Sequence, residues 1–244
     1  GVVGHVHGRA DEARFNEPRD VAVAPDGTIY VADTGNHVIR KITPDGIVST
    51  LNALSDRVVE IFPGYAVDAG DFRDGPLDEA KFNEPYALEW DRKGNLYVSD
   101  SGNHLIRYVD LAAGRVSTVA GTVRRDMYAE GALYAAGAYA DGAARQAGFH
   151  FPKGLAATDD GGLVIADSLN HTVRFLHDGT VTTLAGSMRA EHGFADGVNG
   201  RNLLHHPTDV AVAGGNLLIA DAYNQRIRTF SLYVLPEGAE RDGI

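Results

Sequence analysis

One pattern occurs four times along the 244 residues, and this repetition constrains the fold more than any other feature. Each copy has a nine-residue segment, a Pro three residues later, an Asp after an apolar alternation, and an Arg seven residues beyond that Asp. The nine-residue segments are 7–15, 74–82, 141–149 and 196–204, and the prolines are Pro18, Pro85, Pro152 and Pro207. Such internal similarity predicts one structural unit that is repeated four times.

Short apolar stretches and glycine turns alternate within each copy. In the first copy, residues 21–24 alternate between larger and smaller apolar side chains, Asp26 and Gly27 form a hairpin-turn pair, and further strands are expected at 29–31, 38–42 and 47–51. One small antiparallel sheet cannot bury both of its faces, and radial stacking of such sheets solves this. The sequence therefore predicts an all-β protein, a β-propeller with four recognisable blades, and the 29 glycines provide its turns.

The repeated stretches resemble the NHL-repeat family of β-propellers. FNEPRDVAVAPDGTIYVADTGNHVIRKI, residues 15–42, and FNEPYALEWDRKGNLYVSDSGNHLIRYV, residues 82–109, are close to that family's consensus. The third copy carries VIADSLNHTVRF and the fourth LIADAYNQRIRTF. The resemblance implies a propeller of bacterial type. It leaves function open, because the family includes scaffolds, ligand sensors, RNA binders and a few enzymes.

The repeats also predict how the chain is divided. We expect a propeller over residues 1–234 and a tail or linker at 235–244, with further modules beside it. The expected blades are 8–52, 75–121, 142–186, and 197–234 completed by a strand from residues 1–6. This N-terminal strand would close the ring at four blades; the alternative is a fragment of a six-bladed propeller. Two long inserts, 53–73 and 122–140, interrupt the repeats, and loops of this length are often functional.

Composition excludes several classes of function. The net charge of −11 opposes binding to nucleic acid, and no apolar run is long enough to insert into a membrane. The absence of Cys excludes disulfides and thiol chemistry. We expect a monomeric domain at the cell surface or outside the cell, with the cytoplasm as the alternative.

The recurring Asp and Arg predict a structural pair in every blade. An Asp at a strand end with an Arg on the next strand forms an ion pair that holds the turn. A ring of four Asp around the axis, binding a cation, is the alternative. The pairs are Asp33 with Arg40, Asp100 with Arg107, Asp167 with Arg174, and Asp221 with Arg228.

Histidines occupy two repeated positions. His37, His104 and His171 follow the turn Asn, with Gln225 in the fourth copy, so we expect them to have a structural or surface role. His150 and His205 stand at matching positions near the prolines, where they could hold a transition metal if a third ligand joined them. The alternative is that they form ordinary hydrogen bonds beside the inner strand.

The residues directly after the repeated prolines differ from copy to copy, and this variation marks them as ligand-binding candidates. Side chains that differ between the repeats of a symmetric scaffold can make one face of it specific for a ligand. Two cations and an aromatic ring among them suit an acidic or glycan ligand. The predicted channel-mouth residues are Arg19, Asp20, Tyr86, Lys153, Thr208 and Asp209.

No catalytic motif occurs in the chain. There is no nucleophile elbow, phosphate loop or metal-binding helix motif, and we assign no catalytic residue and no cofactor. The preferred function is a non-catalytic binding or scaffold propeller that recognises a protein, glycan or small ligand at the channel mouth and the long inserts. The alternative is a hydrolase, lactonase or lyase with a divalent metal in the central channel.

Overall fold

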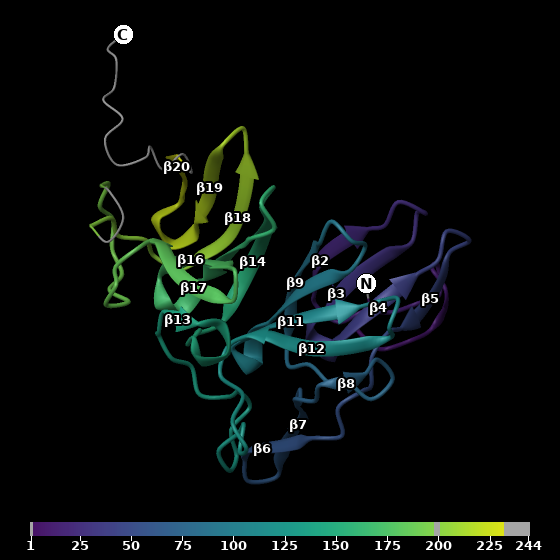
Figure 1. Ribbon diagram of the computed structural model, residues 1–244. Helices are drawn as coiled ribbons and strands as arrows, with labels where there is room; N and C mark the ends of the chain where they lie inside the picture. Colours follow the sequence, from purple (N-terminus) through teal and green to yellow (C-terminus); the bar gives the residue numbers. More distant parts are fainter. Residues whose placement is uncertain (1, 198–200, 232–244) are drawn as a thin grey trace.

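The computed structural model describes residues 2–197 and 201–231. Its regular structure is nearly all β: four sheets fan out from four inner strands, and a fifth sheet is a two-stranded hairpin in insert 53–73 (Figure 1). The inner strands are β2 (Pro18–Val23), β9 (Pro85–Trp90), β14 (Pro152–Ala157) and β18 (Pro207–Ala213). Each of them contacts the inner strand of the next sheet along the chain. The predicted four-bladed β-propeller arrangement is confirmed, and the sheets are called blades 1 to 4 below.

Blade 1 is a five-stranded antiparallel sheet in which the inner strand β2 comes first in sequence after a short outer strand. Its order is β1-β5-β4-β3-β2, with β1 (Gly8–Arg9), β3 (Ile29–Asp33), β4 (Val38–Ile42) and β5 (Ile47–Thr50). The turn between β2 and β3 depends on Gly27, which has a φ of +84°. The Thr28 backbone N–H donates to the Asp26 carboxylate at 2.9 Å and supports this turn.

Blades 2 and 3 repeat the strand order of blade 1. Blade 2 adds β8 (Gly75–Pro76), β10 (Leu96–Asp100), β11 (Leu105–Asp110) and β12 (Arg115–Ala120) to β9. Blade 3 adds β13 (Gly142–Ala143), β15 (Leu163–Asp167), β16 (Thr172–His177) and β17 (Thr180–Ala185) to β14.

Blade 4 has three strands in the described part of the chain. They are β18, β19 (Asn216–Asp221) and β20 (Arg226–Ser231). The expected end of this blade, 232–234, and the expected tail, 235–244, lie outside the described residues.

Short 3-10 turns follow the repeated Asp in every blade. They are η1 (Thr34–Asn36), η2 (Ser101–Asn103), η4 (Ser168–Asn170) and η5 (Ala222–Asn224), whereas η3 (Ala144–Gln146) lies in the third nine-residue segment. The residue after each of the turns η1, η2, η4 and η5 has a left-handed backbone conformation, with φ between 53° and 57°. These residues are His37, His104, His171 and Gln225.

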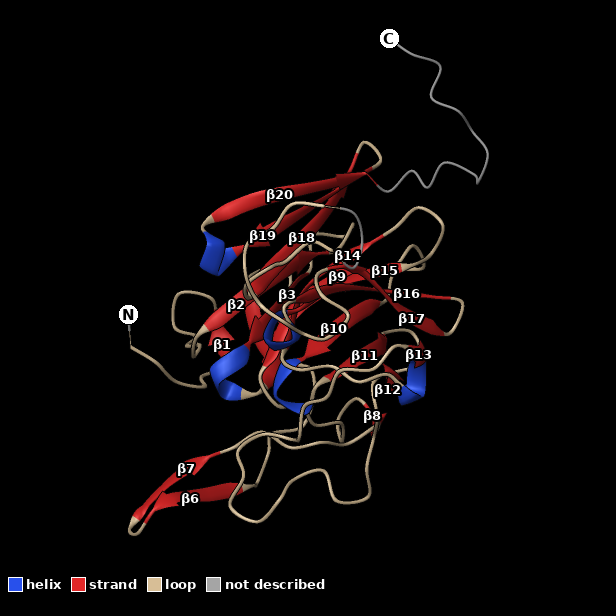
Figure 2. Ribbon diagram, turned by 90° about the vertical axis from the view of Figure 1, so that its left-hand side faces the viewer, coloured by secondary structure: helices blue, strands red, loops and turns tan. Residues whose placement is uncertain are grey.

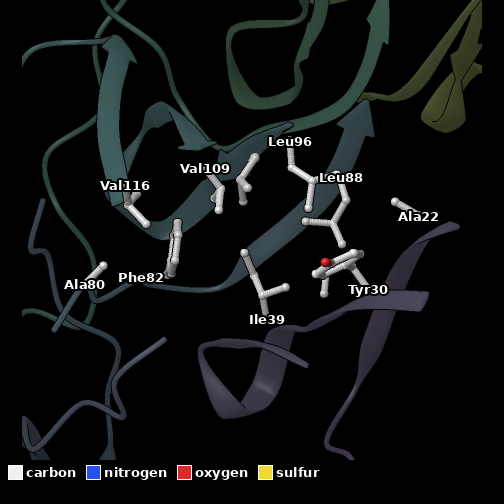
Figure 3. Close-up of a cluster of buried hydrophobic side chains, with 11 residues drawn as sticks. Ala22, Tyr30, Ile39, Ala80, Phe82, Leu88, Leu96, Val109 and Val116 are labelled. Atoms are coloured by element: carbon white, nitrogen blue, oxygen red, sulfur yellow. The ribbon is translucent and has the colours of Figure 1, made fainter. Parts of the chain in front are cut away.

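Hydrophobic cores lie between neighbouring blades. Between blades 1 and 2, Tyr30 and Ile39 belong to the same buried cluster as Phe82, Leu88 and Leu96 (Figure 3). Corresponding clusters join blade 2 to blade 3 and blade 3 to blade 4. Burying one such side chain is worth about 1.5–3 kcal/mol, so each blade is stabilised mainly by its neighbours.

The N-terminal segment belongs to blade 1, and the expected pairing of residues 1–6 with the last blade is wrong for the described residues. Val6 bridges to Arg14, and β1 pairs with β5. Arg40 Nη2 donates to the Val6 carbonyl at 2.8 Å, just as Arg107 donates to the Arg73 carbonyl in blade 2. The residues just before each nine-residue segment therefore belong to the same blade as that segment.

Blade 1 has one face that no other blade covers in the described residues. Val21 is 58% exposed, whereas Leu88, Leu155 and Val210, at the matching position in the other blades, are between 4% and 7% exposed. Those three side chains lie in the seams between neighbouring blades. Within the described residues, blade 4 does not cover blade 1, so they do not form the expected closed ring.

The two inserts fold differently from each other. Insert 53–73 contains a hairpin of β6 (Val58–Phe62) and β7 (Tyr65–Asp68), which projects from the blades (Figure 2). Insert 122–140 has no strand. Arg57 joins the two inserts: its guanidinium donates to the carbonyls of Ala132 and Leu133 at 2.6 Å and lies over the Tyr128 ring. The hairpin had no repeat counterpart, and the sequence did not predict it.

Candidate functional site

The variable residues after the prolines converge where the inner strands begin. Arg19 of blade 1 and Lys153 of blade 3 both lie near the Tyr86 ring of blade 2. The Arg19 Cζ is 5.9 Å and the Lys153 Nζ 5.2 Å from the centre of that ring. Three neighbouring blades therefore place two cations and one aromatic ring together, within the range of cation–π attraction.

A histidine of the preceding blade holds the start of the inner strand in blades 2, 3 and 4. The residue before each repeated Pro is left-handed, with φ near 50°. In three blades its backbone N–H donates to Nδ1 of the turn histidine of the blade before. The bonds are Glu84 to His37 at 3.1 Å, Phe151 to His104 at 3.0 Å, and His206 to His171 at 3.2 Å. These inter-blade bonds fix the positions of Tyr86 and Lys153, which follow two residues later.

A small cavity lies at the same end of the inner strands. Its volume is about 180 Å³. It is lined by Arg19, Asp20, Tyr86, Ala87, Gly154, Thr208 and Asp209. Five of the six predicted channel-mouth residues thus share one cavity, and the sixth, Lys153, contacts its Tyr86. We call Arg19, Tyr86 and Lys153, with Glu84 and Tyr134, the mouth site.

The positive charge of the mouth site is only partly compensated. Arg19 pairs with the exposed Glu17 carboxylate at 2.9 Å. Lys153 has no carboxylate within 4.0 Å in the described part of the chain. Burial lowers the pKa of Lys153, and the charge of Arg19 lowers it further. The charge of Glu84 acts in the opposite direction and raises this pKa, so Glu84 compensates Lys153 in part without forming an ion pair with it.

Glu84 and Tyr134 complete the mouth site, and no sequence pattern predicted either of them there. The Tyr134 hydroxyl, from insert 122–140, donates to Glu84 at 2.8 Å. Burial raises the pKa of Glu84. Glu84 stands directly before a repeated Pro, but only the structure shows its contact with an insert that has no repeat counterpart.

Carboxylates further along the inner strands connect the blades. Asp20 accepts from the Leu88 backbone N–H at 2.8 Å, and Glu89 accepts from the Ala157 N–H at 3.1 Å. Burial raises the pKa of both carboxyls. The Asp209 carboxylate accepts from the Val210 N–H at 2.9 Å. Asp20 therefore lines the cavity and also ties blade 1 to blade 2.

The repeated Asp and Arg form buried ion pairs. The Arg to Asp distances are 3.1 Å for Arg40–Asp33, 2.5 Å for Arg107–Asp100, 2.7 Å for Arg174–Asp167 and 3.0 Å for Arg228–Asp221. The carboxylates also accept from the turn Asn and from a backbone N–H. All four Asp side chains are fully buried within their blades, so they do not line a central cation site.

The nine-residue segments supply second partners for these arginines. Asp74, Asp141 and Asp196 pair with the Arg of their own blade at 2.6–2.7 Å. His7 occupies this position in blade 1 and bonds Thr50 instead. The Asp-Gly at the start of three of the four segments is the sequence signal for this role.

His150 and His205 lie in different histidine groups. The His150 ring is 5.2 Å from the His104 ring, whereas the His205 ring is 4.6 Å from His192 and 5.6 Å from His171. Burial lowers the pKa of His150. Among residues 2–197 and 201–231, no three His, Asp or Glu side chains are arranged to hold a metal ion. The side-chain positions therefore give no support to the predicted metal pair.

Comparisons with known proteins agree with this architecture. A sequence model described as NHL repeat matches residues 15–42, 149–174 and 204–230. NHL repeat-containing protein 2 of Bos taurus is 32% identical over 249 residues, an alignment that covers 92% of this chain. The chain spans only 32% of that relative's length. No helix in the described residues is both long and apolar enough to span a membrane.

Solved structures show the same fold at low sequence identity. An auxiliary nutrient binding protein of Bacteroides ovatus has a TM-score of 0.63 at 21% identity, covering 89% of this chain and 48% of that protein. A gluconolactonase of Xanthomonas campestris has a TM-score of 0.52 at 15% identity, covering 89% of this chain and 59% of that protein. With its repeated sequence, its four blades and these similarities, the chain belongs to the NHL-repeat β-propellers.

Proposed function

We propose that this chain is a non-catalytic binding propeller whose mouth site takes a small ligand that carries a carboxylate. One observation carries the proposal: Arg19 and Lys153, from different blades, both lie within 6 Å of the Tyr86 ring centre. Two cations beside one aromatic ring, on a chain with a net charge of −11, support a site for an anionic group.

Two cations of the mouth site lie close enough to share one anionic group, although the carboxylates of Asp20 and Asp209 also line the cavity. Arg19 and Lys153 repel each other, and this repulsion contributes to the lowered pKa of Lys153. A carboxylate placed between them removes the repulsion and gains charge-assisted hydrogen bonds. The Tyr86 ring offers the same ligand an apolar surface.

The size of the cavity restricts the ligand. Its volume of about 180 Å³ is below the ~300–1,000 Å³ that is usual for drug-sized ligands. It therefore suits a single carboxylate-bearing unit, such as a sugar acid or the acidic end of a longer molecule. The fold similarity to a protein described as nutrient binding supports a binding role.

Calorimetric titration tests the proposal with matched pairs of compounds. The pairs are acetate with acetamide, succinate with succinamide, and D-galacturonate with D-galactose. We expect at least one carboxylate to bind, its neutral counterpart not to bind, and added salt to weaken the interaction. Lys153→Gln should lower the affinity about tenfold or more, because a hydrogen bond to a charged group is worth ~1.5–3 kcal/mol.

The control is Lys41→Gln, which removes a lysine on β4 of blade 1, outside the mouth site. It should leave the affinity unchanged. If no carboxylate binds, or if acids and neutral counterparts bind equally, the proposal is wrong.

The metal-dependent hydrolase or lactonase is the competing function. The fold similarity to a gluconolactonase leaves it open as a class. It requires one divalent metal per chain that is lost in His150→Ala, whereas the binding propeller requires none. Elemental analysis of the purified protein separates the two. The location outside the cell and the bacterial origin stay predictions.

A further inference from the structure

A larger hollow lies at the other ends of the inner strands. It has a volume of about 490 Å³ and is bounded by two turns, 91–95 of blade 2 and 158–162 of blade 3. Tyr97, Tyr108 and Val119 of blade 2 line it, with Ala157 of blade 3. A second hollow of about 210 Å³ shares Tyr97, Val119 and Gly161 with the first. Together they make an elongated groove along the seam between blades 2 and 3, which we call the seam groove.

Two tyrosine rings provide an aromatic surface in the seam groove. Tyr97 and Tyr108 face each other across the β10–β11 pair, with ring centres 5.2 Å apart and planes tilted by 56°. The Tyr108 hydroxyl is fixed, because it donates to Asp91 at 2.5 Å and accepts from Asn95 at 2.8 Å. No hydrogen-bond partner is found for the Tyr97 hydroxyl in the described part of the chain, so it is free to bind a ligand.

The rim of the seam groove carries polar groups of both signs. Arg92 of the blade 2 turn pairs with Asp159 of the blade 3 turn, and both side chains are more than 60% exposed. Exposed ion pairs are worth only ~0–1 kcal/mol, so ligand hydroxyls can replace this one at little cost. Lys93 and Asp160 stand beside the pair. No atom lies within 4 Å of the position that a Cβ of Gly161 would occupy, so this part of the rim does not block access to the groove.

These features select against charged ligands. The lining of the two hollows holds four carboxylates and two cations, and Arg92 already pairs with Asp159, so the remaining excess of negative charge opposes an anionic ligand. Asp91 is already occupied, since it accepts from the Lys93 and Asn95 backbone N–H groups at 2.7 Å as well as from Tyr108. An aromatic cage for a quaternary ammonium ion would need an unoccupied anion beside the rings, and Asp91 is not one.

We propose that the seam groove binds a neutral carbohydrate chain. The apolar face of a pyranose ring stacks on Tyr97 and Tyr108, and its hydroxyl groups bond the Tyr97 hydroxyl and the planar side chains of Arg92 and Asp159. Such a site combines an aromatic floor with a few placed polar groups, at a volume usual for ligand pockets. The elongated shape, continued past Gly161 toward His177, fits more than one sugar unit.

Titration of the full chain with four neutral hexasaccharides tests the seam groove: cellohexaose, maltohexaose, mannohexaose and xylohexaose. We expect at least one to bind. Tyr97→Ala should lower that affinity about tenfold or more through the loss of stacking. Tyr97→Phe keeps the ring and the fold, and should lower the affinity a fewfold through the loss of the hydroxyl alone.

Matched controls separate the seam groove from general effects. Arg92→Ala should weaken binding a fewfold, whereas Arg9→Ala, which removes an equally exposed Arg paired with Asp11, should not. Lys153→Gln at the mouth site should leave the hexasaccharide affinity unchanged. The proposal is overturned if none of the four sugars binds, if Tyr97→Phe and Arg92→Ala both bind like the native chain, or if a proline-rich peptide binds at Tyr97 instead.

Discussion

At the scale of single residues, the turn histidines act as neutral hydrogen-bond acceptors between blades. His104 shows both of its contacts: Nδ1 accepts from the Phe151 N–H at 3.0 Å, and Nε2 bonds the Ala135 carbonyl at 2.8 Å. Because a carbonyl can only accept, Nε2 carries the proton and Nδ1 does not. Burial lowers the pKa of His37, His104 and His171 to about 4. Protonation would remove the acceptor that positions the next inner strand.

A pH-dependent stability follows from His104. Its pKa is 6.5 when unfolded and about 4 when folded, so between these values the unfolded chain binds more protons. Its stabilisation is complete above pH 6.5 and is lost as the pH falls toward 4. Asp100 and Asp167, whose pKa burial raises to about 6, act in the opposite direction, so native and variant chains must be compared. The excess Tm of the native chain over His104→Gln should be larger at pH 7 than at pH 5.

Gln is the appropriate replacement because Gln225 occupies the same left-handed position in blade 4. Thr229→Gln, at an exposed position of β20 that does not titrate, serves as the control and should show no such trend. A Tm difference between native and His104→Gln that stays constant from pH 5 to pH 7 would contradict the neutral acceptor.

The buried ion pairs allow a second residue-scale prediction. Arg107→Met should lower the free energy of unfolding by about 3–5 kcal/mol, because it leaves the Asp100 carboxylate buried without its partner. Arg73→Met removes an exposed Arg paired with Glu79 and should cost less than ~1 kcal/mol. Urea denaturation of both variants measures the difference. Equal costs would show that the Asp100 charge is compensated elsewhere.

At the scale of elements, the two inserts form one structure beside the mouth site. Arg57 binds the carbonyls of Ala132 and Leu133, and the next residue, Tyr134, contacts Glu84. The guanidinium also donates to the Gly70 carbonyl at 2.6 Å, so one side chain binds three carbonyls from both inserts. The position of Tyr134 in the mouth site therefore depends on a residue of the other insert.

Arg57→Lys should loosen insert 122–140 without unfolding the blades. A lysine ammonium cannot reproduce the planar set of donors that binds three carbonyls. We expect hydrogen exchange to become faster at residues 128–135, with little change in the strands of blade 2. The control is Glu60→Gln, in the hairpin itself, which should leave exchange at 128–135 unchanged. Unchanged exchange in Arg57→Lys would mean that other contacts hold the inserts together.

The whole molecule shows which levels of structure the repeats determine. The four sheets and their ion pairs follow from patterns that lie within one repeat, and so they could be predicted. The variation after the prolines located Arg19, Tyr86 and Lys153, because their neighbours in space occupy the same place in successive repeats. Tyr134 could not be found in this way, because its insert has no equivalent residues in the other repeats with which to compare it. The N-terminal segment is a different case: its bridge to Arg14 and its bond from Arg40 have counterparts in every blade, but these contacts leave no pattern in the sequence.

Blade 1 tests the arrangement of the whole molecule. Val21 and Leu155 occupy the same position in their repeats, but Val21 is 58% and Leu155 7% exposed. Leu155→Ala should lower the free energy of unfolding by about 2–5 kcal/mol, because it opens a cavity in the seam between blades 2 and 3. Val21→Ala should change it by no more than ~0.5 kcal/mol, as expected for a surface substitution. Denaturant titration measures both. A cost for Val21→Ala that approaches the cost for Leu155→Ala would mean that another blade covers this face, and the open order of blades 1 to 4 would be wrong.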